Sequence, residues 1–222
     1  MMTTAALELK KMLEEKGVVL VAVSKTKPAS MIQDFYDIGF RIFGENRVQE
    51  LVDKHELLPK DIQWHMIGNL QKNKVKYIAP FVSLIHSVSS SSLLEKINNE
   101  AKKNHRRIPI LLQLKIAEEY TKSGLEEQEL TALAQEIQDN KYPHIIFKGL
   151  MGMATFTDDR DQLKLEFSKL TVCCQSLGKE AFDLGPSEHP TLSFGMSGDY
   201  ELAVEEGSNM VRIGSKLFGA RW

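Results

Sequence analysis

The sequence has little cysteine, little net charge and no long apolar run, and each shortage excludes a class of protein. Its 222 residues include two cysteines, which are adjacent and therefore form neither a disulfide scaffold nor a spaced metal site. The formal net charge is -2, so no overall basic field attracts nucleic acid or anionic lipid. No apolar stretch is long enough to span a bilayer. We expect a soluble protein of the reducing cytoplasm, without nucleic-acid or membrane partners.

The chain also lacks a linker rich in proline or glycine, a low-complexity segment and a shift in composition. Apolar residues make up 42% and charged residues 26%, which is typical of globular proteins that bury one sizeable core. We therefore predict a single domain over residues 1–222. Its first 17 residues are amphipathic and contain acids as well as lysines, which is unlike a secretory or transit peptide and predicts an N-terminal helix.

Short β-branched apolar runs alternate with longer helical patterns, which indicates a parallel sheet with helical crossovers. Eight strands are predicted, at residues 18–24, 41–45, 63–67, 84–88, 109–116, 145–151, 191–195 and 210–214. Segments 126–139 and 160–179 each carry one apolar stripe and are expected to be helices covering the sheet. Eight units favour an α/β fold, a single (β/α)8 TIM barrel with an extra N-terminal helix, over an open sheet of roughly five or six strands. In a barrel, functional residues lie at the carboxyl ends of the strands.

Lys25 directly follows the first predicted strand, where its ammonium would enter the mouth of the barrel. A lysine in apolar surroundings loses solvation of its charged form, which makes the neutral amine available to attack a carbonyl carbon. This is the requirement for a Schiff base. Position alone is equally compatible with a lysine whose ammonium reaches solvent, so a second observation has to decide.

Two motifs near the C-terminus supply that observation. FGMSGD (194–199) follows the seventh predicted strand, and VRIGS (211–215) forms the eighth. Close backbone approach and hydroxyl donors come from Gly195, Ser197, Gly214 and Ser215. A helix expected over 198–206 would direct its N-terminus to the same place. Because loops after strands seven and eight of a TM barrel commonly bind phosphate, and strand eight closes beside strand one, the motifs and Lys25 together predict one site.

Arg212 lies within the apolar eighth strand, where a buried guanidinium needs an anionic or acceptor partner. One hypothesis places it against an aromatic nitrogen of a ligand. The alternative is an ion pair with a carboxylate such as Glu45, which is expected to pair with Arg212 or cap a helix rather than act as an acid or base. His65 and His86 lie near strand ends without further metal ligands at suitable spacing, so they are expected to be structural and no metal site is predicted.

Taken together, these motifs resemble the pyridoxal phosphate homeostasis protein family, which has the barrel of the alanine racemase N-terminal domain and binds its cofactor as a fold-type III protein. The matching segments follow in order over nearly the whole chain, as AVSKTKP (22–28), FGENRVQE (43–50), WHMIGNLQKNK (64–74), KSG (122–124), GLMGMA (149–154), LSFGMSGDYELAVEEGS (192–208) and VRIGSKLFGAR (211–221). The departures are mild, with Thr155 and Phe156 in place of Ile-Pro, Phe194 in place of Met, and Ser215 in place of Thr. Serine preserves the hydroxyl.

The resemblance implies that pyridoxal 5'-phosphate (PLP) is held as a Schiff base on Lys25. The other residues it implies are Asn46 in the pocket wall, Ser197, Gly214 and Ser215 at the phosphate, and Arg212 at the pyridine nitrogen. An arginine does not readily protonate that nitrogen, so PLP is expected to be a weak electron sink here. Related racemases add a second domain with a catalytic tyrosine, for which a chain ending at Trp222 is expected to leave no room.

The expected function is therefore PLP binding in intracellular PLP homeostasis, by buffering the cofactor or delivering it to PLP-dependent apoenzymes, without turnover of amino acids. Two enzyme alternatives stay open. One is a PLP-dependent amino-acid racemase that uses Lys25 and a second base. The other is a Schiff-base aldolase acting on a phosphorylated substrate. A monomer is expected, because the resemblance implies no partner domain that completes the pocket.

Overall fold

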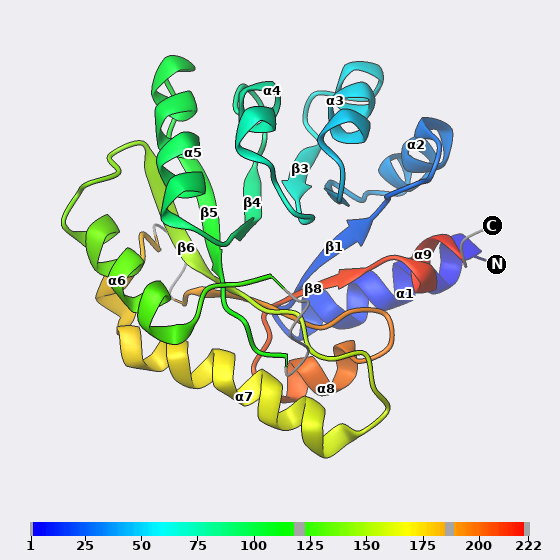
Figure 1. Cartoon of the computed structure of the whole chain (residues 1–222). Helices are drawn as coiled ribbons and strands as arrows, with labels where there is room; N and C mark the ends of the chain where they lie inside the picture. The colour runs from blue at the N-terminus through cyan, green and yellow to red at the C-terminus, as the bar shows by residue number, and fades with distance from the viewer. Residues whose placement is uncertain (1, 118–122, 185–188, 220–222) are drawn as a thin grey trace.

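The protein forms a closed barrel of eight parallel strands in chain order, with β1 beside β8 (Figure 1). The computed structural model describes residues 2–117, 123–184 and 189–219. The strands are β1 (Val19–Val23), β2 (Ile42–Glu45), β3 (Gln63–Met66), β4 (Leu84–Val88), β5 (Ile108–Gln113), β6 (Ile145–Met151), β7 (Thr191–Ser193) and β8 (Met210–Ile213). The barrel closes through parallel pairs from Val19 with Met210 to Ala22 with Ile213. The predicted TIM barrel is confirmed, and the open sheet is wrong.

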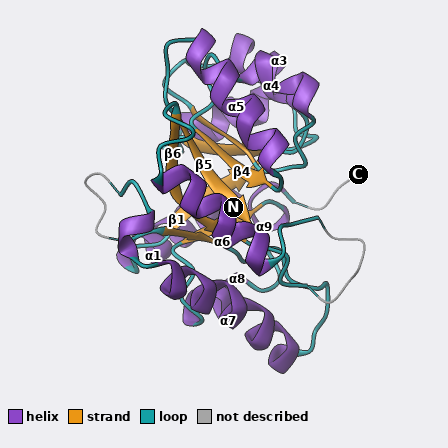
Figure 2. Ribbon diagram, turned by 60° about the vertical axis from the view of Figure 1, so that its left-hand side comes forward, coloured by secondary structure: helices purple, strands orange, loops and turns teal. Residues whose placement is uncertain are grey.

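Helices follow the strands and enclose the sheet, as Figure 2 shows. They are α1 (Met2–Glu15), α2 (Ala29–Asp37), α3 (Val48–Leu57), α4 (Val75–Ile78), α5 (Ser91–Lys103), α6 (Glu127–Gln138), α7 (Arg160–Leu177), α8 (Tyr200–Glu205) and α9 (Ser215–Phe218), with 3-10 turns η1 (Lys72–Lys74) and η2 (Lys179–Ala181). The extra N-terminal helix is confirmed as α1, which packs beside α9. Within the described ranges, no helix combines the length and apolarity needed to cross a membrane.

The helices predicted over 126–139 and 160–179 are confirmed as α6 and α7. α7 begins where the Asp159 carboxylate accepts two backbone N–H groups of the first turn, and it ends at Gly178 with φ 75°. Both cysteines lie on its buried face and are free. Burial raises the pKa of each thiol to about 11, so both remain protonated near neutral pH. Their role in this helix is to pack.

Alternation along the strands sorts the buried side chains into two clusters. Outward-facing residues such as Phe43 and Trp64 pack beneath the helices. The inward-facing cluster is smaller and consists of Val21, Leu84, Leu111, Met151 and Met210. Just beyond β1, Ser24 continues this alternation toward the helices, where its hydroxyl donates to Glu45. The first predicted site residue, Lys25, comes next, in the turn at the carboxyl end of the strand.

Candidate functional site

The carboxyl ends of β1, β2 and β8 bring several of the predicted site residues to one end of the barrel. Lys25 is half-buried after β1, and Asn46 is half-buried after β2. Gly214 follows β8, and a Cβ added there would lie 3.2 Å from the Val23 carbonyl oxygen. Since Val23 precedes Lys25 by two residues, closure of the barrel brings the lysine next to the C-terminal glycine motif.

Ser197 and Gly214, from the two C-terminal motifs, contact one another. The Gly214 N–H donates a hydrogen bond to Ser197 Oγ over 3.2 Å. Ser215 is the next residue along the chain, begins α9 and is exposed. Two hydroxyl groups and the backbone N–H groups at the start of α9 therefore lie together. This is a donor set that suits the oxygens of a phosphate group.

Gly195 determines the path of the chain between β7 and α8. Its φ is 90°, and a Cβ added there would lie 2.5 Å from the Ala203 Cβ, so only glycine fits against the helix. The helix predicted over 198–206 is present, but it begins at Tyr200 and has six residues. A helix this short carries a small dipole. The main hydrogen-bond donors of the candidate phosphate site are therefore the hydroxyl groups of Ser197 and Ser215 and the backbone N–H groups after β8. We call this set of donors the cradle.

Arg212 lies inside the barrel and is 4% exposed. Its Nη1 donates to the carbonyl oxygen and the hydroxyl of Ser193, both over 2.7 Å, and its Nη2 donates to the Gly152 carbonyl oxygen over 3.0 Å. These bonds use three of the five guanidinium N–H groups and leave the Nε–H and one Nη2–H for another acceptor. Burial lowers the Arg212 pKa to about 10, so the group is a cation near neutral pH. The alternative of an ion pair with Glu45 is wrong.

Two buried histidines extend the contacts of Arg212 across the barrel interior. His86 Nδ1 lies 3.1 Å from Ser193 Oγ, and His86 Nε2 lies 3.0 Å from His65 Nδ1. Because Arg212 donates to Ser193 Oγ, we assign the hydroxyl proton to the bond with His86, whose Nε2–H then donates to His65. Burial lowers the pKa of His65 to about 3 and that of His86 well below its ordinary value. Both rings are neutral and hold Ser193, and through it Arg212, in place.

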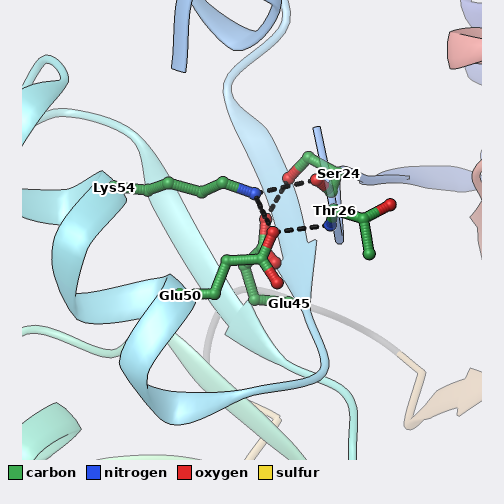
Figure 3. Close-up of polar contacts among 5 residues, drawn as sticks. All are labelled: Ser24, Thr26, Glu45, Glu50 and Lys54. Carbon is green, nitrogen blue, oxygen red and sulfur yellow. Dashed lines mark hydrogen bonds and ion pairs between the residues drawn. The ribbon is translucent and has the colours of Figure 1, made fainter. Parts of the chain in front are cut away.

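A second buried network lies between β1, β2 and α3, on the outer side of the wall (Figure 3). Lys54 Nζ donates to the Ser24 carbonyl oxygen over 2.8 Å and to Glu45 Oε1 and Glu50 Oε1 over 2.7 Å each. Ser24 Oγ donates to Glu45 Oε1 over 2.6 Å, and the Thr26 N–H donates to Glu50 Oε1 over 2.5 Å. Burial raises the Glu45 pKa to about 7, although Lys54 and Ser24 act to lower it. The partner of Glu45 is therefore Lys54.

Known proteins resemble the chain over almost its full length. The family model described as the N-terminal domain of alanine racemase matches residues 5–221. A pyridoxal phosphate homeostasis protein from Aquifex aeolicus is 38% identical over 203 residues, which cover 91% of this chain and 86% of that protein. The human protein of the same name is 38% identical over 216 residues, which cover 91% of this chain and 76% of the human protein. The chain belongs to the pyridoxal phosphate homeostasis protein family.

Solved structures of related proteins have the same barrel. PipY of Synechococcus elongatus, solved with PLP bound, is 32% identical to this family member and superposes with a TM-score of 0.86 over 99% of this chain and 100% of PipY. Alanine racemase of Bartonella henselae, solved with covalently bound PLP, superposes with a TM-score of 0.72 over 98% of this chain and 61% of the racemase. At 17% identity, this second likeness shows a shared fold alone.

The family motifs found in the sequence differ in how much of their structure is described. Lys122 of the KSG motif and Arg221 of the last motif lie outside the described residues. Sequence reasoning missed Lys54 and Glu50, although their spacing of four residues on a helix is the ordinary signal for an ion pair. It also missed Ser193, which lies in the matching segment 192–208 and connects Arg212 to His86.

Proposed function

We propose that this member of the pyridoxal phosphate homeostasis protein family binds PLP at the carboxyl end of its barrel and acts in intracellular PLP homeostasis. The observation that carries the proposal is the convergence, at one end of the barrel, of Lys25, the Arg212 guanidinium and the contact between Ser197 and Gly214. The names of the curated relatives and the PLP-bound structure of PipY support it. The chain then buffers the cofactor or delivers it.

The residues fit the acidic end of the cofactor. A phosphate group accepts hydrogen bonds from the hydroxyls of Ser197 and Ser215 and from the backbone N–H groups at the start of α9. Gly214 allows the phosphate to approach the backbone, because it carries no side chain where the chain passes close to Val23. The cradle is thus made of short, uncharged donors held by two neighbouring strands.

The other parts of the cofactor meet Lys25, Arg212 and Asn46. When bound, PLP supplies a reactive aldehyde, and its condensation with the Lys25 amine forms one C=N bond and releases one water. The N–H groups that Arg212 does not use inside the barrel donate to the pyridine nitrogen, and Asn46 lines the pocket. Arg212 remains a cation and holds its protons at pKa about 10. A ring nitrogen that receives a hydrogen bond but no proton favours binding over amino-acid turnover.

Further features of this function follow as parts of the proposal. Residues 1–222 form one PLP-binding domain, which acts as a monomer in the cytoplasm. PLP-dependent apoenzymes receive the cofactor from it. Sedimentation of the purified protein tests the monomer, and transfer of bound PLP to an apoenzyme, followed by recovery of that enzyme's activity, tests delivery.

The decisive experiment for PLP binding is absorption spectroscopy combined with chemical trapping. Purified protein is titrated with PLP, reduced with borohydride and mapped by peptide mass. A visible absorption band and a reduced label on Lys25 support the proposal, and Lys25→Ala should lose both. The matched control is Lys16→Ala, because Lys16 is exposed near the opposite end of β1.

Two results would overturn the proposal. A missing band, or a label spread over surface lysines, would remove PLP and direct attention to an aldolase that is trapped by borohydride with a phosphorylated substrate alone. A bound cofactor accompanied by steady loss of optical rotation from a single amino-acid enantiomer would instead identify a racemase.

A further inference from the structure

We infer that Lys54 is a positioning residue for Lys25, because its ammonium, together with Glu45 and Glu50, fixes the backbone on both sides of that lysine. The inference rests on the proposed function, in which Lys25 Nζ bonds the PLP aldehyde carbon. Lys54 lies on α3, outside the barrel wall, and acts on the site through the main chain alone.

The contacts of Lys54 hold both peptide groups that flank Lys25. The carbonyl of the preceding peptide group belongs to Ser24 and accepts from Lys54 Nζ over 2.8 Å. The N–H of the following peptide group belongs to Thr26 and donates to Glu50 Oε1 over 2.5 Å, and the same oxygen accepts from Lys54. The Lys54 ammonium therefore holds the Ser24 carbonyl directly and the Thr26 N–H through Glu50, as Figure 3 shows. These two contacts constrain the peptide planes on either side of Lys25.

The conformation of Thr26 is a second, independent observation. Its φ is 67°, in the left-handed region that a β-branched residue rarely adopts. Such a conformation persists only where surrounding contacts enforce it, and these conformations gather at functional sites. The hydrogen bond from Thr26 to Glu50 is a contact of this kind. The turn after β1 is thus held in an unfavourable shape at the residue next to Lys25.

The burial of the network indicates that it does more than stabilise the fold. Lys54 is 5% exposed and Glu45 is fully buried. Burying an ion pair loses solvation that the attraction often fails to recover, and apolar residues fill such a space as well or better. Glu45 Oε2 is buried and makes no hydrogen bond to a described residue. The Lys54 ammonium and the main chain beside Lys25 therefore have more of their hydrogen bonds made than the Glu45 carboxylate has.

A double variant separates positioning from folding. Lys54→Met alone leaves Glu45 as an uncompensated buried acid, so the test uses Lys54→Met with Glu45→Gln, which removes both charges together. This variant loses the hydrogen bond from Lys54 to the Ser24 carbonyl. It keeps the hydroxyl groups of Ser197 and Ser215 and the guanidinium of Arg212, which are proposed to bind the ligand. We expect the affinity for PLP and the rate of appearance of its visible band to fall about tenfold, because the reacting nitrogen is misplaced.

A ligand without the aldehyde supplies the readout that a general structural role would not change. The compound 4'-deoxypyridoxine 5'-phosphate has the ring and phosphate of PLP but forms no bond with Lys25. Its affinity should change by less than about twofold in the double variant, because the phosphate donors and Arg212 are unaltered. The ratio of the two affinities therefore measures the placement of Lys25.

Two further variants complete the experiment. Glu50→Ala removes the acceptor of the Thr26 N–H and should change the ratio in the same direction by a smaller factor. Lys96→Met is the matched control, because Lys96 forms an ion pair of the same spacing with Glu100 on α5, over 2.7 Å. It should leave the ratio unchanged.

The outcomes distinguish the inference from the function on which it rests. If the wild-type protein forms no visible band, the proposed function fails. Suppose instead that the wild type forms the band, and that the double variant and Glu50→Ala both keep the wild-type ratio of the two affinities and the wild-type rate of band formation. Lys54 then does not position Lys25. Equal losses of affinity for both ligands would also overturn the inference, since they indicate general damage. If the double variant does not fold, Glu50→Ala decides by the same two readouts.

Discussion

Two buried polar networks support the proposed site from opposite sides of the barrel wall, and they hold charge differently. Outside the wall, Lys54 is surrounded by two carboxylates, and the Glu50 side chain is 22% exposed. Inside the barrel, Arg212 is held by oxygens and by the neutral pair His65 and His86. The outer network therefore pairs a cation with carboxylates, one of which, Glu50, is partly exposed to solvent. In the buried interior, neutral groups support the Arg212 cation.

This difference gives the two networks opposite pH dependences. Because the pKa of Glu45 is raised, the folded state binds the Glu45 proton more tightly than the unfolded state does. The stability that this proton contributes is complete below about pH 4.5 and is lost as the pH rises through about 7. The lowered pKa values of His65 and His86 mean that the unfolded state takes up protons first. Their contribution is complete above about pH 6.5 and is lost as the pH falls below it.

The largest effect is expected from breaking the outer network at its cation. Lys54→Met should lower the free energy of unfolding by about 3–5 kcal/mol at pH 8, because Glu45 is left as a buried, unpaired acid. The loss should be smaller at pH 5, where Glu45 is protonated in the folded state. Urea unfolding at the two pH values measures both. Adding Glu45→Gln should recover much of the loss at pH 8, and an equal loss at both pH values would contradict the assigned pKa.

The inner network should respond to acid. His65→Gln keeps a hydrogen-bonding side chain but removes a titrating group, so the variant should lose about 2 kcal/mol less stability than wild type between pH 7 and pH 5. The measurement is urea unfolding of the protein without ligand at both pH values. An unaltered difference in His65→Gln would mean that His65 is protonated in the fold.

A smaller effect is expected where the inner network meets Arg212. Ser193→Ala removes one of the three acceptors of Arg212 and its link to His86. Affinity for PLP should fall about fivefold, which corresponds to about 1 kcal/mol. Ser208→Ala is the control, since that buried hydroxyl bonds three carbonyl oxygens and does not contact Arg212. Isothermal titration calorimetry compares the two, and equal affinities would show that Ser193 does not hold the guanidinium.

The smallest effect concerns the strained turn beside the outer network. Thr26→Gly places at this position a residue that adopts a φ of 67° without strain. It keeps the backbone N–H that donates to Glu50. Relief of strain is partly offset by the greater freedom of glycine in the unfolded chain, so stability should rise by about 0.5 kcal/mol. Thermal unfolding measures it. A marked fall in stability would mean that the threonine side chain makes contacts that outweigh the strain.

The barrel and the positions of its motifs could be predicted because both depend on local pattern. Strand and helix periods are written in consecutive residues, and closure then brings Lys25 beside Gly214. Pairing across the wall could not be read this way. Glu45 and Arg212 are both near strand ends, but Ile42 and Met210 face inward, so Arg212 shares their side while Glu45 takes the other. The sequence contains this parity, but only the folded barrel shows which of the two faces points inward.

Contacts between distant strands were beyond prediction for a different reason. The distance between His86 on β4 and Ser193 on β7 depends on the curvature of the closed barrel, which no local pattern reports. Lys54 likewise looks like a surface residue in a helix of mixed composition. Only the packing of α3 against β2 and β3 buries its ammonium beneath the Ser24 carbonyl.

The pairing of the first strand with the last also governs when the site comes into being during synthesis. Lys25 is made about 190 residues before Arg212, which corresponds to roughly 10–40 seconds on a ribosome. Throughout that interval the lysine exists without Arg212 and Gly214, which complete the proposed site. A nascent chain therefore lacks the complete proposed site, and under the proposed function stable capture of PLP reports that the barrel has closed.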